Sequence, residues 1–404
     1  MSEPAFTCIV TSSFGLESLV RAEIDALGVS GARTLDRRVI FTGTARDIAR
    51  CNICLRVADR VLIEATEIPA PDFDSLYEGI RSLPWRDLLA RGAAVTVNAR
   101  SVKSRLSAIP SIQSVAKRAI LDGLTGRRAR ATGTGGTGPH HDRGPRLPET
   151  GPSYDVEVML NADRASICLD TTGPGLHKRG YRKGTGEAPL RENLAAGLVA
   201  LSRWEPPRPF TDPMCGAGTI PIEAALRAAG IAPGQGRAFA AEQWPLIPGR
   251  AWQDARAEAR AREHRDADIH LEASDSDPRM VALARRNAEA AGVEGLIGFR
   301  VADIQGMTPA GEHGCMICNP PYGERLGDER EVQELARALA GLFERASTWS
   351  LFVLSGREDF QKLFGARADR NRKLYNGNIR CWYYQYYRPL RPQRGDAPSV
   401  SHPH

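Results

Sequence analysis

The 404-residue sequence has no apolar stretch long enough to cross a lipid bilayer. Its first residues, MSEPAFTCIV, also lack the basic segment and apolar core of a secretory signal peptide. No internal repeat is present, so the chain is not a repeat array. With 42% hydrophobic and 25% charged residues, the composition is that of a soluble globular protein. We therefore expect a cytoplasmic protein without a membrane partner.

A strong net charge is missing as well, because 54 Lys and Arg residues oppose 48 Asp and Glu residues. The charge is unevenly distributed, however. Ten basic residues lie between Arg100 and Arg146, and only Asp122 and Asp142 oppose them there. A second basic cluster, HKRGYRKG, occupies residues 177–184. Basic segments often only solvate a surface, but their concentration in one part of a mixed chain favours a polyanionic partner.

The sequence has few cysteine spacings that are typical of metal sites. The eight cysteines include two C-x-x-C pairs, Cys51/Cys54 and Cys315/Cys318. A zinc or redox site would need further ligands or a different setting. Both pairs lie in apolar segments, so we interpret them as small buried residues that the cytosol keeps reduced. We expect no metal site.

The length favours two or three domains. The first hundred residues alternate strand-like and helix-like segments, among them a helix-like run over residues 44–68. Residues 125–153 are rich in glycine, proline and small polar side chains, which predicts a mobile insertion loop. This loop does not end a domain, because the alternating strands that follow, YDVEVMLNADRASICLDTTG, need partners from the preceding part.

A larger region from about residue 188 to 389 has the strand–helix rhythm of a parallel sheet. It closes with KLYNGNIRCWYYQYY, which predicts a hairpin around Asn376-Gly377. The first strand–helix junction in this region is DPMCGAGT, residues 212–219. Its glycines, Gly216 and Gly218, permit a tight turn and the close approach of a ligand.

Three further signals follow predicted strands. Asp275 in ASDSDP is a carboxylate that can accept hydrogen bonds from both hydroxyls of a ribose. Asp303 in RVADIQG is placed to accept from an adenine amino group. The last signal is the tetrapeptide NPPY, which begins at Asn319 and ends an apolar run.

Taken singly, each signal has a simpler interpretation. Glycine turns are common, and this spacing fits neither a phosphate-binding lysine motif nor a full dinucleotide fingerprint. Asp277 suits the N-cap of the following helix, and Asp303 equally suits a capping or loop position. Together, however, the residues follow successive strands, whose carboxyl ends form the edge where open α/β sheets bind ligands.

With these motifs, the region from Ala188 to Pro389 resembles the class I S-adenosylmethionine-dependent methyltransferases that methylate amino groups, whose signature is Asn-Pro-Pro-Tyr. Further segments resemble the bacterial ribosomal RNA guanine methyltransferases with an N-terminal THUMP domain: LHKRGYRKGTGEAPLRENLAAGLV, PMCGAGTIPIEAA, PGQGRAFAAEQW and NPPYGERLG. The resemblance implies an α/β fold, in which an α+β ferredoxin-like/THUMP module precedes a Rossmann-like domain with a mostly parallel seven-stranded sheet and a C-terminal hairpin. The expected domains are 1–55 (ferredoxin-like module), 56–172 (THUMP RNA-binding domain), 173–187 (basic linker), 188–389 (methyltransferase domain) and 390–404 (disordered tail).

The resemblance also implies the cofactor and the site. The cofactor is S-adenosylmethionine, and no metal takes part. The cofactor-binding residues are expected to be Asp212, Pro213, Cys215, Gly216, Gly218, Thr219, Asp275, Ser276, Asp303, Ile304 and Asn319. The catalytic residues are expected to be Asn319, Pro320, Pro321 and Tyr322. The RNA-binding residues are expected to be Lys103, Arg105, Lys117, Arg118, Lys178, Arg179 and Arg182.

The tetrapeptide NPPY suits methyl transfer to a base. An exocyclic amino group is a poor nucleophile because its lone pair is delocalised into the ring. Acceptance of its two hydrogens by the Asn319 side-chain oxygen and the Pro320 carbonyl would localise that pair and direct it at the donor methyl. The prolines restrict the backbone, and Tyr322 offers a face on which a flipped base can stack. Catalysis then comes chiefly from positioning in a site without water.

The tetrapeptide serves adenine, cytosine and guanine alike, so the N-terminal half decides the substrate. A ferredoxin-like module with a THUMP domain implies RNA, and we favour the N2 amino group of a guanine in 23S ribosomal RNA. The alternative is a guanine in tRNA. An N6-adenine nucleic-acid methylase would leave the N-terminal half without a purpose. A non-catalytic RNA-binding assembly factor would be expected to have lost the glycines and strand-end acids, all of which are present.

Overall fold

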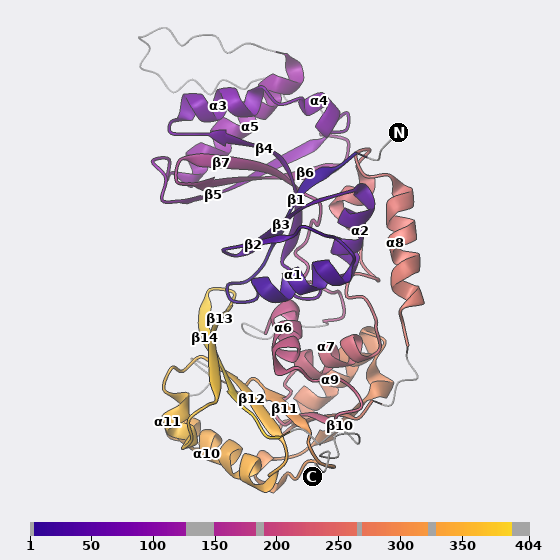
Figure 1. Cartoon of the computed structure of the whole chain (residues 1–404), viewed down its shortest axis with the longest axis vertical. Helices are drawn as coiled ribbons and strands as arrows, with labels where there is room; N and C mark the ends of the chain where they lie inside the picture. Colours follow the sequence, from indigo (N-terminus) through magenta and orange to yellow (C-terminus); the bar gives the residue numbers. More distant parts are fainter. Residues whose placement is uncertain (1–3, 127–148, 183–189, 265–268, 322–328, 390–404) are drawn as a thin grey trace, which may run out of the picture. The chain divides into compact units, whose positions relative to one another are not determined.

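The computed structural model describes residues 4–126, 149–182, 190–264, 269–321 and 329–389 (Figure 1). The chain divides into two compact units. The first unit comprises Met1–Ser12, Glu17–Lys178 and Ala232–Ala261. The second comprises Ser13–Leu16, Arg179–Ile231 and Arg262–His404. Most of the expected insertion loop and the expected tail lie outside the described residues.

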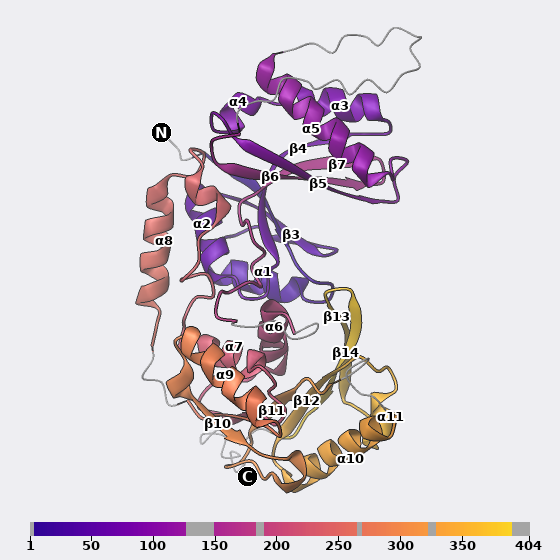
Figure 2. The same cartoon turned by 180° about the vertical axis from the view of Figure 1, so that it is seen from behind.

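The first unit is built on a seven-stranded sheet with the order β2-β3-β1-β4-β7-β6-β5 (Figures 1 and 2). Its strands are β1 (Phe6–Thr11), β2 (Arg33–Leu35), β3 (Arg38–Gly43), β4 (Arg60–Pro69), β5 (Ala94–Val102), β6 (Ser153–Asn161) and β7 (Arg164–Asp170). Its helices are α1 (Glu17–Ala26), α2 (Ala45–Cys54), α3 (Phe73–Arg81), α4 (Trp85–Leu88), α5 (Ile109–Thr125), η1 (Ala240–Gln243) and α8 (Gly249–Ala261). Neighbouring strands are antiparallel except for the β5–β6 pair.

Strand β4 joins the two halves of this sheet, since it pairs with β1 on one side and with β7 on the other. The two strands that follow the expected insertion loop are β6 and β7, and they pair with β5 and β4. The expectation that the preceding part supplies their partners is therefore confirmed. The boundary expected at residue 55 stays a prediction, and the sheet continues across it.

The helix expected over residues 44–68 is wrong beyond Cys54. Helix α2 ends there, and its C-cap Leu55 is extended, with φ −67° and ψ 124°. Residues 60–69 form β4, with Val61, Leu62 and Ile63 buried. Apolar and β-branched side chains in succession suit a strand of a packed sheet. The apolar content continues from the helix into the strand, so the pattern alone did not mark the change.

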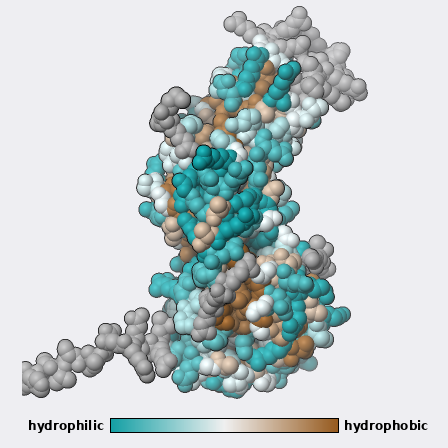
Figure 3. All heavy atoms as spheres, turned by 90° about the vertical axis from the view of Figure 1, so that its right-hand side faces the viewer, coloured by the Kyte–Doolittle hydropathy of each residue, from teal (hydrophilic) through white to brown (hydrophobic). Residues whose placement is uncertain are grey.

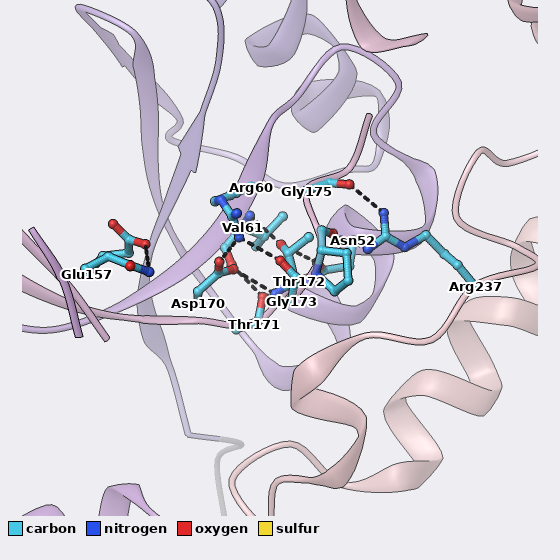
Figure 4. Close-up of polar contacts among 12 residues, drawn as sticks. Asn52, Arg60, Val61, Glu157, Asp170, Thr171, Thr172, Gly173, Gly175 and Arg237 are labelled. Atoms are coloured by element: carbon cyan, nitrogen blue, oxygen red, sulfur yellow. Dashed lines mark hydrogen bonds and ion pairs between the residues drawn. The ribbon is translucent and has the colours of Figure 1, made fainter. Parts of the chain in front are cut away.

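The segment Ala232–Ala261 lies in the first unit, although the chain on both sides of it belongs to the second. Trp244 of this segment stacks on Tyr154 of β6, with ring centroids 4.3 Å apart. Arg237 donates to the carbonyl of Gly175 at 2.8 Å (Figure 4). The two compact units thus share residues 188–389, a range that the sequence assigned to one domain.

A buried polar network lies where β4, β7 and α2 meet (Figure 4). Asp170 at the end of β7 is fully buried and forms an ion pair with Arg60. The Thr172 amide donates to Asp170 at 2.9 Å, and the Asn52 side chain contacts both Thr171 and Thr172 at 2.9 Å. Burial outweighs the favourable effect of Arg60 and raises the pKa of Asp170 to about 6.

This carboxyl makes the stability of the first unit pH-dependent. Because the pKa of Asp170 is higher in the folded than in the unfolded chain, its stabilising contribution is complete below about pH 4 and is lost as the pH rises through about 6. Asp170→Asn removes this titrating group. We therefore expect the unfolding free energy of wild type minus that of Asp170→Asn to fall by about 3 kcal/mol as the pH rises through that interval. Urea titrations at several pH values measure it. Parallel stability curves for the two proteins would contradict the assignment.

The second unit contains the other seven-stranded sheet, with the order β10-β9-β8-β11-β12-β14-β13. Its strands are β8 (Phe210–Asp212), β9 (Leu271–Asp275), β10 (Ile297–Val301), β11 (Cys315–Cys318), β12 (Ser350–Ser355), β13 (Arg370–Asn376) and β14 (Ile379–Tyr386). Its helices are α6 (Glu192–Ser202), α7 (Thr219–Ala228), α9 (Pro278–Ala290), η2 (Glu294–Leu296), η3 (Ile304–Gly306), α10 (Glu329–Arg345) and α11 (Phe360–Phe364).

The strands β8 to β12 are parallel, and β14 is antiparallel to both of its neighbours. This confirms the predicted mostly parallel sheet with a C-terminal hairpin, in which Asn376 pairs with Ile379 across a two-residue turn. The chain order reverses between β8 and β11, and such a switch point is where open α/β sheets bind ligands.

The interior of each unit is apolar, and the surface is mixed. All eight cysteines are free thiols, and seven of them are buried. Figure 3 shows mainly hydrophilic surface, with hydrophobic patches on both units. Among the helices of the described residues, none combines the length and the apolar character that a bilayer-spanning segment requires.

Candidate active site

A cavity of about 480 Å³ opens at the carboxyl ends of β8, β9, β10 and β11 in the second unit. Ten of the eleven predicted cofactor-binding residues line it, namely Asp212, Pro213, Cys215, Gly216, Thr219, Asp275, Ser276, Asp303, Ile304 and Asn319. The structure therefore brings these residues, which are spread over more than a hundred positions of the chain, to one place.

The turn after β8 approaches the cavity without side chains. Gly216 and Gly218 both have positive φ, +51° and +81°, a region that other residues enter only with strain. A Cβ atom on Gly216 would meet no heavy atom within 4 Å, and Gly216 lines the cavity. A Cβ atom on Gly218 would lie 2.9 Å from the Cβ of Ala284 in α9. The first glycine therefore leaves space for a ligand, and the second allows two helices to pack.

Substitution of the two glycines separates these roles. We expect Gly218→Ala to destabilise the protein by about 2 kcal/mol, because it combines an unfavourable φ with a steric clash. Gly216→Ala is expected to cost about 1 kcal/mol of stability through φ alone. Its methyl group would project into the cavity and weaken cofactor binding about tenfold. Chemical denaturation and calorimetric titration with S-adenosylhomocysteine measure the two effects, and equal losses in both variants would contradict the division.

Asp275 at the end of β9 organises the base of the cavity. One carboxylate oxygen accepts from the Gly216 amide and the other from the Asp277 amide, both at 3.0 Å. These bonds fix the glycine turn and the start of α9 while Asp275 still lines the cavity. Asp277 is the N-cap of α9, as predicted, and accepts from the Arg279 amide at 2.8 Å. Asp303 both lines the cavity and caps η3 by accepting from Gln305 at 2.8 Å.

An acidic and a basic side chain, Asp212 and Arg182, both line the cavity. Asp212 is buried and accepts from the Met214 amide at 3.1 Å. Burial chiefly raises the pKa of Asp212, and the nearby Asp275 carboxylate raises it further. A cationic group in the cavity would therefore stabilise the ionised form of Asp212.

Arg182 was expected to bind RNA, but the structure places it in the cavity wall. Its guanidinium donates to the Glu192 carboxylate at 3.0 Å, the Leu190 carbonyl at 2.8 Å and the Thr219 hydroxyl at 3.2 Å. These bonds hold a positive charge beside the first residue of α7. An ammonium group near Asp212 and a carboxylate near Arg182 would both be stabilised, so the pair suits the amino-acid end of a zwitterionic ligand.

Arg179 is also placed differently from its expected role. Its side chain is 2% exposed and pairs with the fully buried Glu223 at 3.4 Å. Tyr181 donates to the same carboxylate at 3.1 Å. A guanidinium in this position pairs with a carboxylate inside the unit and is not accessible to a phosphate at the surface. The other expected RNA-binding residues lie in the first unit, where Lys103, Lys178, Arg105 and Arg118 are exposed and Lys117 is half-buried.

Asn319 follows β11, whose four residues are fully buried. Its side-chain oxygen is itself buried and has no hydrogen-bond partner within the described part of the chain. A buried amide oxygen without a partner costs free energy, so its position at a cavity indicates a donor on the ligand. Pro320 is buried and Pro321 lines the cavity. Tyr322 lies outside the described residues.

Sequence reasoning missed several cavity residues. Met280 and Leu283 of α9 and Leu335 of α10 supply apolar walls, and Leu190 lies beside Arg182. Met280 and Leu283 are three residues apart in a helix that directly follows Asp277, a spacing that places both on one face. Within the described ranges, no group of three or more His, Cys, Asp or Glu side chains could hold a metal ion.

Two protein families match this chain. The RMKL-like methyltransferase domain matches residues 179–385, and the ferredoxin-like domain of RlmL matches residues 7–62. YpsC of Bacillus subtilis (strain 168), whose name describes a candidate RNA methyltransferase, is 40% identical over 389 residues. That alignment covers 96% of this chain and 98% of YpsC.

Solved structures agree with this match. The crystal structure of SMU.472, described as a candidate methyltransferase and complexed with SAH, is 39% identical with a TM-score of 0.85. The alignment covers 96% of this chain and 99% of the SMU.472 chain. A protein of Listeria monocytogenes str. 4b F2365, described as a predicted N6-adenine-specific DNA methylase, is 40% identical with a TM-score of 0.86 and coverages of 96% and 97%.

Proposed function

Because this chain belongs to the RMKL-like methyltransferase family and S-adenosylmethionine is its cofactor, we propose that it methylates the N2 amino group of a guanine in structured RNA. We propose 23S ribosomal RNA as the substrate. The relative SMU.472 was crystallised with SAH, the product that remains after methyl transfer.

The cavity residues fit this cofactor. Asp275 has the position and charge to accept from ribose hydroxyls, and Asp303 can accept from the adenine amino group. Asp212 and Arg182 are an acidic and a basic side chain that can pair with the ammonium and carboxylate of the methionine moiety. Gly216 leaves open space beside them. When bound, the cofactor supplies an electrophilic sulfonium methyl group.

The observation that carries the proposed reaction is the buried side-chain oxygen of Asn319 at this cavity, which finds no hydrogen-bond partner in the described ranges. It can accept a hydrogen from a base amino group, and the Pro320 carbonyl can accept the second. Both bonds draw the nitrogen lone pair out of conjugation and orient it. Since Pro320 and Pro321 restrict the backbone, the carbonyl keeps its direction while the base is bound.

RNA is supported by the first unit. It contains the match to the RlmL ferredoxin-like domain, and the relative YpsC is named for RNA methylation. Lys103, Arg105, Lys178 and Arg118 are exposed there and can meet phosphates. The Listeria relative is described as a predicted N6-adenine-specific DNA methylase, so adenine in DNA is the competing substrate that the test must exclude.

Product analysis tests the proposal. The purified protein and radiolabelled S-adenosylmethionine are incubated with unmodified 23S ribosomal RNA, tRNA or duplex DNA, followed by digestion to nucleosides. We expect label in N2-methylguanosine from 23S ribosomal RNA. The same nucleoside from tRNA alone would replace the ribosomal substrate with the alternative one. N6-methyladenine, or label in DNA alone, would overturn the proposal.

A further inference from the structure

The β13–β14 hairpin of the second unit presents cations and aromatic rings in alternation. Lys373 pairs across the strands with Trp382, and Tyr375 pairs with Arg380. Residues two apart in a strand lie on one face of a sheet, so all four side chains share a face. The Lys373 ammonium lies 5.7 Å from the Tyr375 ring centroid, and the Arg380 guanidinium lies 4.7 Å from that of Trp382. We call these four residues the cation–aromatic square.

The square is accessible. Lys373 is exposed, the Arg380 side chain is 53% exposed, and Tyr375 and Trp382 are half-buried. Phe14, which is 39% exposed and belongs to the same compact unit, contacts the Tyr375 ring edge-on at 6.1 Å. The aromatic surface thus extends beyond the hairpin.

The surroundings of the square are strongly basic. Between residues 357 and 388, eight basic residues stand against three acidic ones. Within the described part of the chain, Arg367, Arg370 and Lys373 form no ion pair, and Arg380 has only a loose contact with Glu358 at 3.9 Å. Such an exposed contact offsets little of the charge. A polyanion fits this surface better than an apolar or cationic partner.

The square lies at the same side of the sheet as the cavity, where the parallel strands have their carboxyl ends. Ser355, the last residue of β12, pairs with Trp382, so the hairpin from Ile379 back to Asn376 continues beyond the carboxyl end of β12. Figures 1 and 2 both show the hairpin projecting past the neighbouring strands. Because β11 and β12 are parallel, Asn319 leaves the sheet at this same edge.

The tip of the hairpin is also attached to the cavity rim. The side-chain oxygen of Asn376 accepts from the Arg191 amide at 3.2 Å. The preceding residue, Leu190, lines the cavity. A strand of nucleotides whose reactive base enters the cavity would therefore have neighbouring nucleotides within reach of the hairpin.

We propose that the cation–aromatic square binds the unpaired nucleotides that flank the target base. Tyr375 and Trp382 offer ring faces on which bases stack, and Lys373 and Arg380 meet the phosphates between them. Holding the flanking nucleotides would keep the target base unstacked and directed at Asn319. This inference rests on the proposed RNA substrate and names the surface that the sequence had left unassigned.

The test uses the full chain and the RNA that it methylates. We expect the double variant Lys373→Glu/Arg380→Glu to raise KM for RNA at least about tenfold. The slope of log KM against log salt concentration should decrease by the amount that corresponds to about two phosphate contacts. Calorimetric affinity for S-adenosylhomocysteine should not change. Tyr375→Ala, which leaves the charge unchanged, should raise KM with little effect on salt dependence. Lys373→Arg/Arg380→Lys should retain nearly wild-type KM.

The matched control is Arg286→Glu/Arg337→Glu, which makes the same change in charge at exposed positions on α9 and α10. It should leave KM within about twofold of wild type. If wild-type protein methylates RNA and the hairpin variants do so with unchanged KM and salt dependence, the hairpin inference is overturned while the proposed function stands. Equal losses in the control would likewise overturn it. If wild-type protein labels no RNA, the proposed function and the inference both fail.

Discussion

Asn319→Ala is expected to lower kcat by about 1000-fold and to leave the affinity for S-adenosylhomocysteine within about threefold of wild type. The Asn319 side-chain oxygen is buried at the cavity and has no hydrogen-bond partner among the residues that the structure describes. Loss of this oxygen therefore breaks no hydrogen bond to the described part of the chain, and the strand that precedes it stays packed between β8 and β12. What disappears is the acceptor that we propose orients the base amino group.

Single-turnover methylation and calorimetry measure the two quantities separately. Thermal unfolding provides a control for folding, since the variant should unfold within a few degrees of wild type. Asn319→Asp, which retains an oxygen acceptor at nearly the same place, should recover part of the rate. A variant with wild-type turnover would remove Asn319 from the reaction. A parallel loss of cofactor affinity would show that the residue serves binding instead.

Asp275→Ala is expected to weaken cofactor binding about 100-fold, because two contributions are lost together. The first is the charged hydrogen bonds that a carboxylate makes to hydroxyl groups. The second is the pair of 3.0 Å bonds that hold the amides of Gly216 and Asp277. Removal of the carboxylate leaves both amides without this acceptor and releases the turn that borders the cavity. Calorimetric titration with S-adenosylhomocysteine measures the change.

Asp277→Ala is the matched control, since it removes a carboxylate only two residues away. Asp277 caps α9 and its side chain bonds to Arg279. We expect a stability loss of about 1 kcal/mol and cofactor affinity within about twofold of wild type. If both variants bound cofactor equally well, the ribose role of Asp275 would be wrong.

The set of strand-end residues that line the cavity was largely predictable, because its determinants are local. A polar residue directly after an apolar strand lies at the carboxyl end of that strand, whatever surrounds it. Asp212, Asp275, Asp303 and Asn319 are of this kind, and the parallel pairing of their strands brings them together. Gly216 and Gly218 are also local signals, since their positive φ belongs to the turn itself.

The helix–strand change at residues 55–60 was less predictable. Helix α2 and strand β4 both mix charged with buried apolar side chains, and both pack in the first unit. Periodicity separates a buried helix from a buried strand poorly when no glycine or proline stands between them. The pairing of β4 with β1 and β7 decides its conformation, and those partners lie far away in the sequence.

The roles of the basic residues depend on folding even more. Lys178, Arg179 and Arg182 form one cluster in the sequence, yet Lys178 is exposed, Arg179 is buried against Glu223, and Arg182 lines the cavity. A charge pattern reports how many charges a segment carries but not the direction of each side chain. The acidic partners, Glu192 and Glu223, come from helices α6 and α7.

By itself, the sequence determined the class of fold, the family signature and the strand-end residues that line the cavity, because each follows from the order of strands, turns and polar residues along the chain. Only the tertiary structure decided that Ala232–Ala261 packs with the first unit, that Arg182 lines the cavity, and that Lys373, Tyr375, Arg380 and Trp382 share one face of a hairpin at its edge. The physical reason is that these features depend on contacts between distant segments, and such contacts form only when the sheets and helices pack.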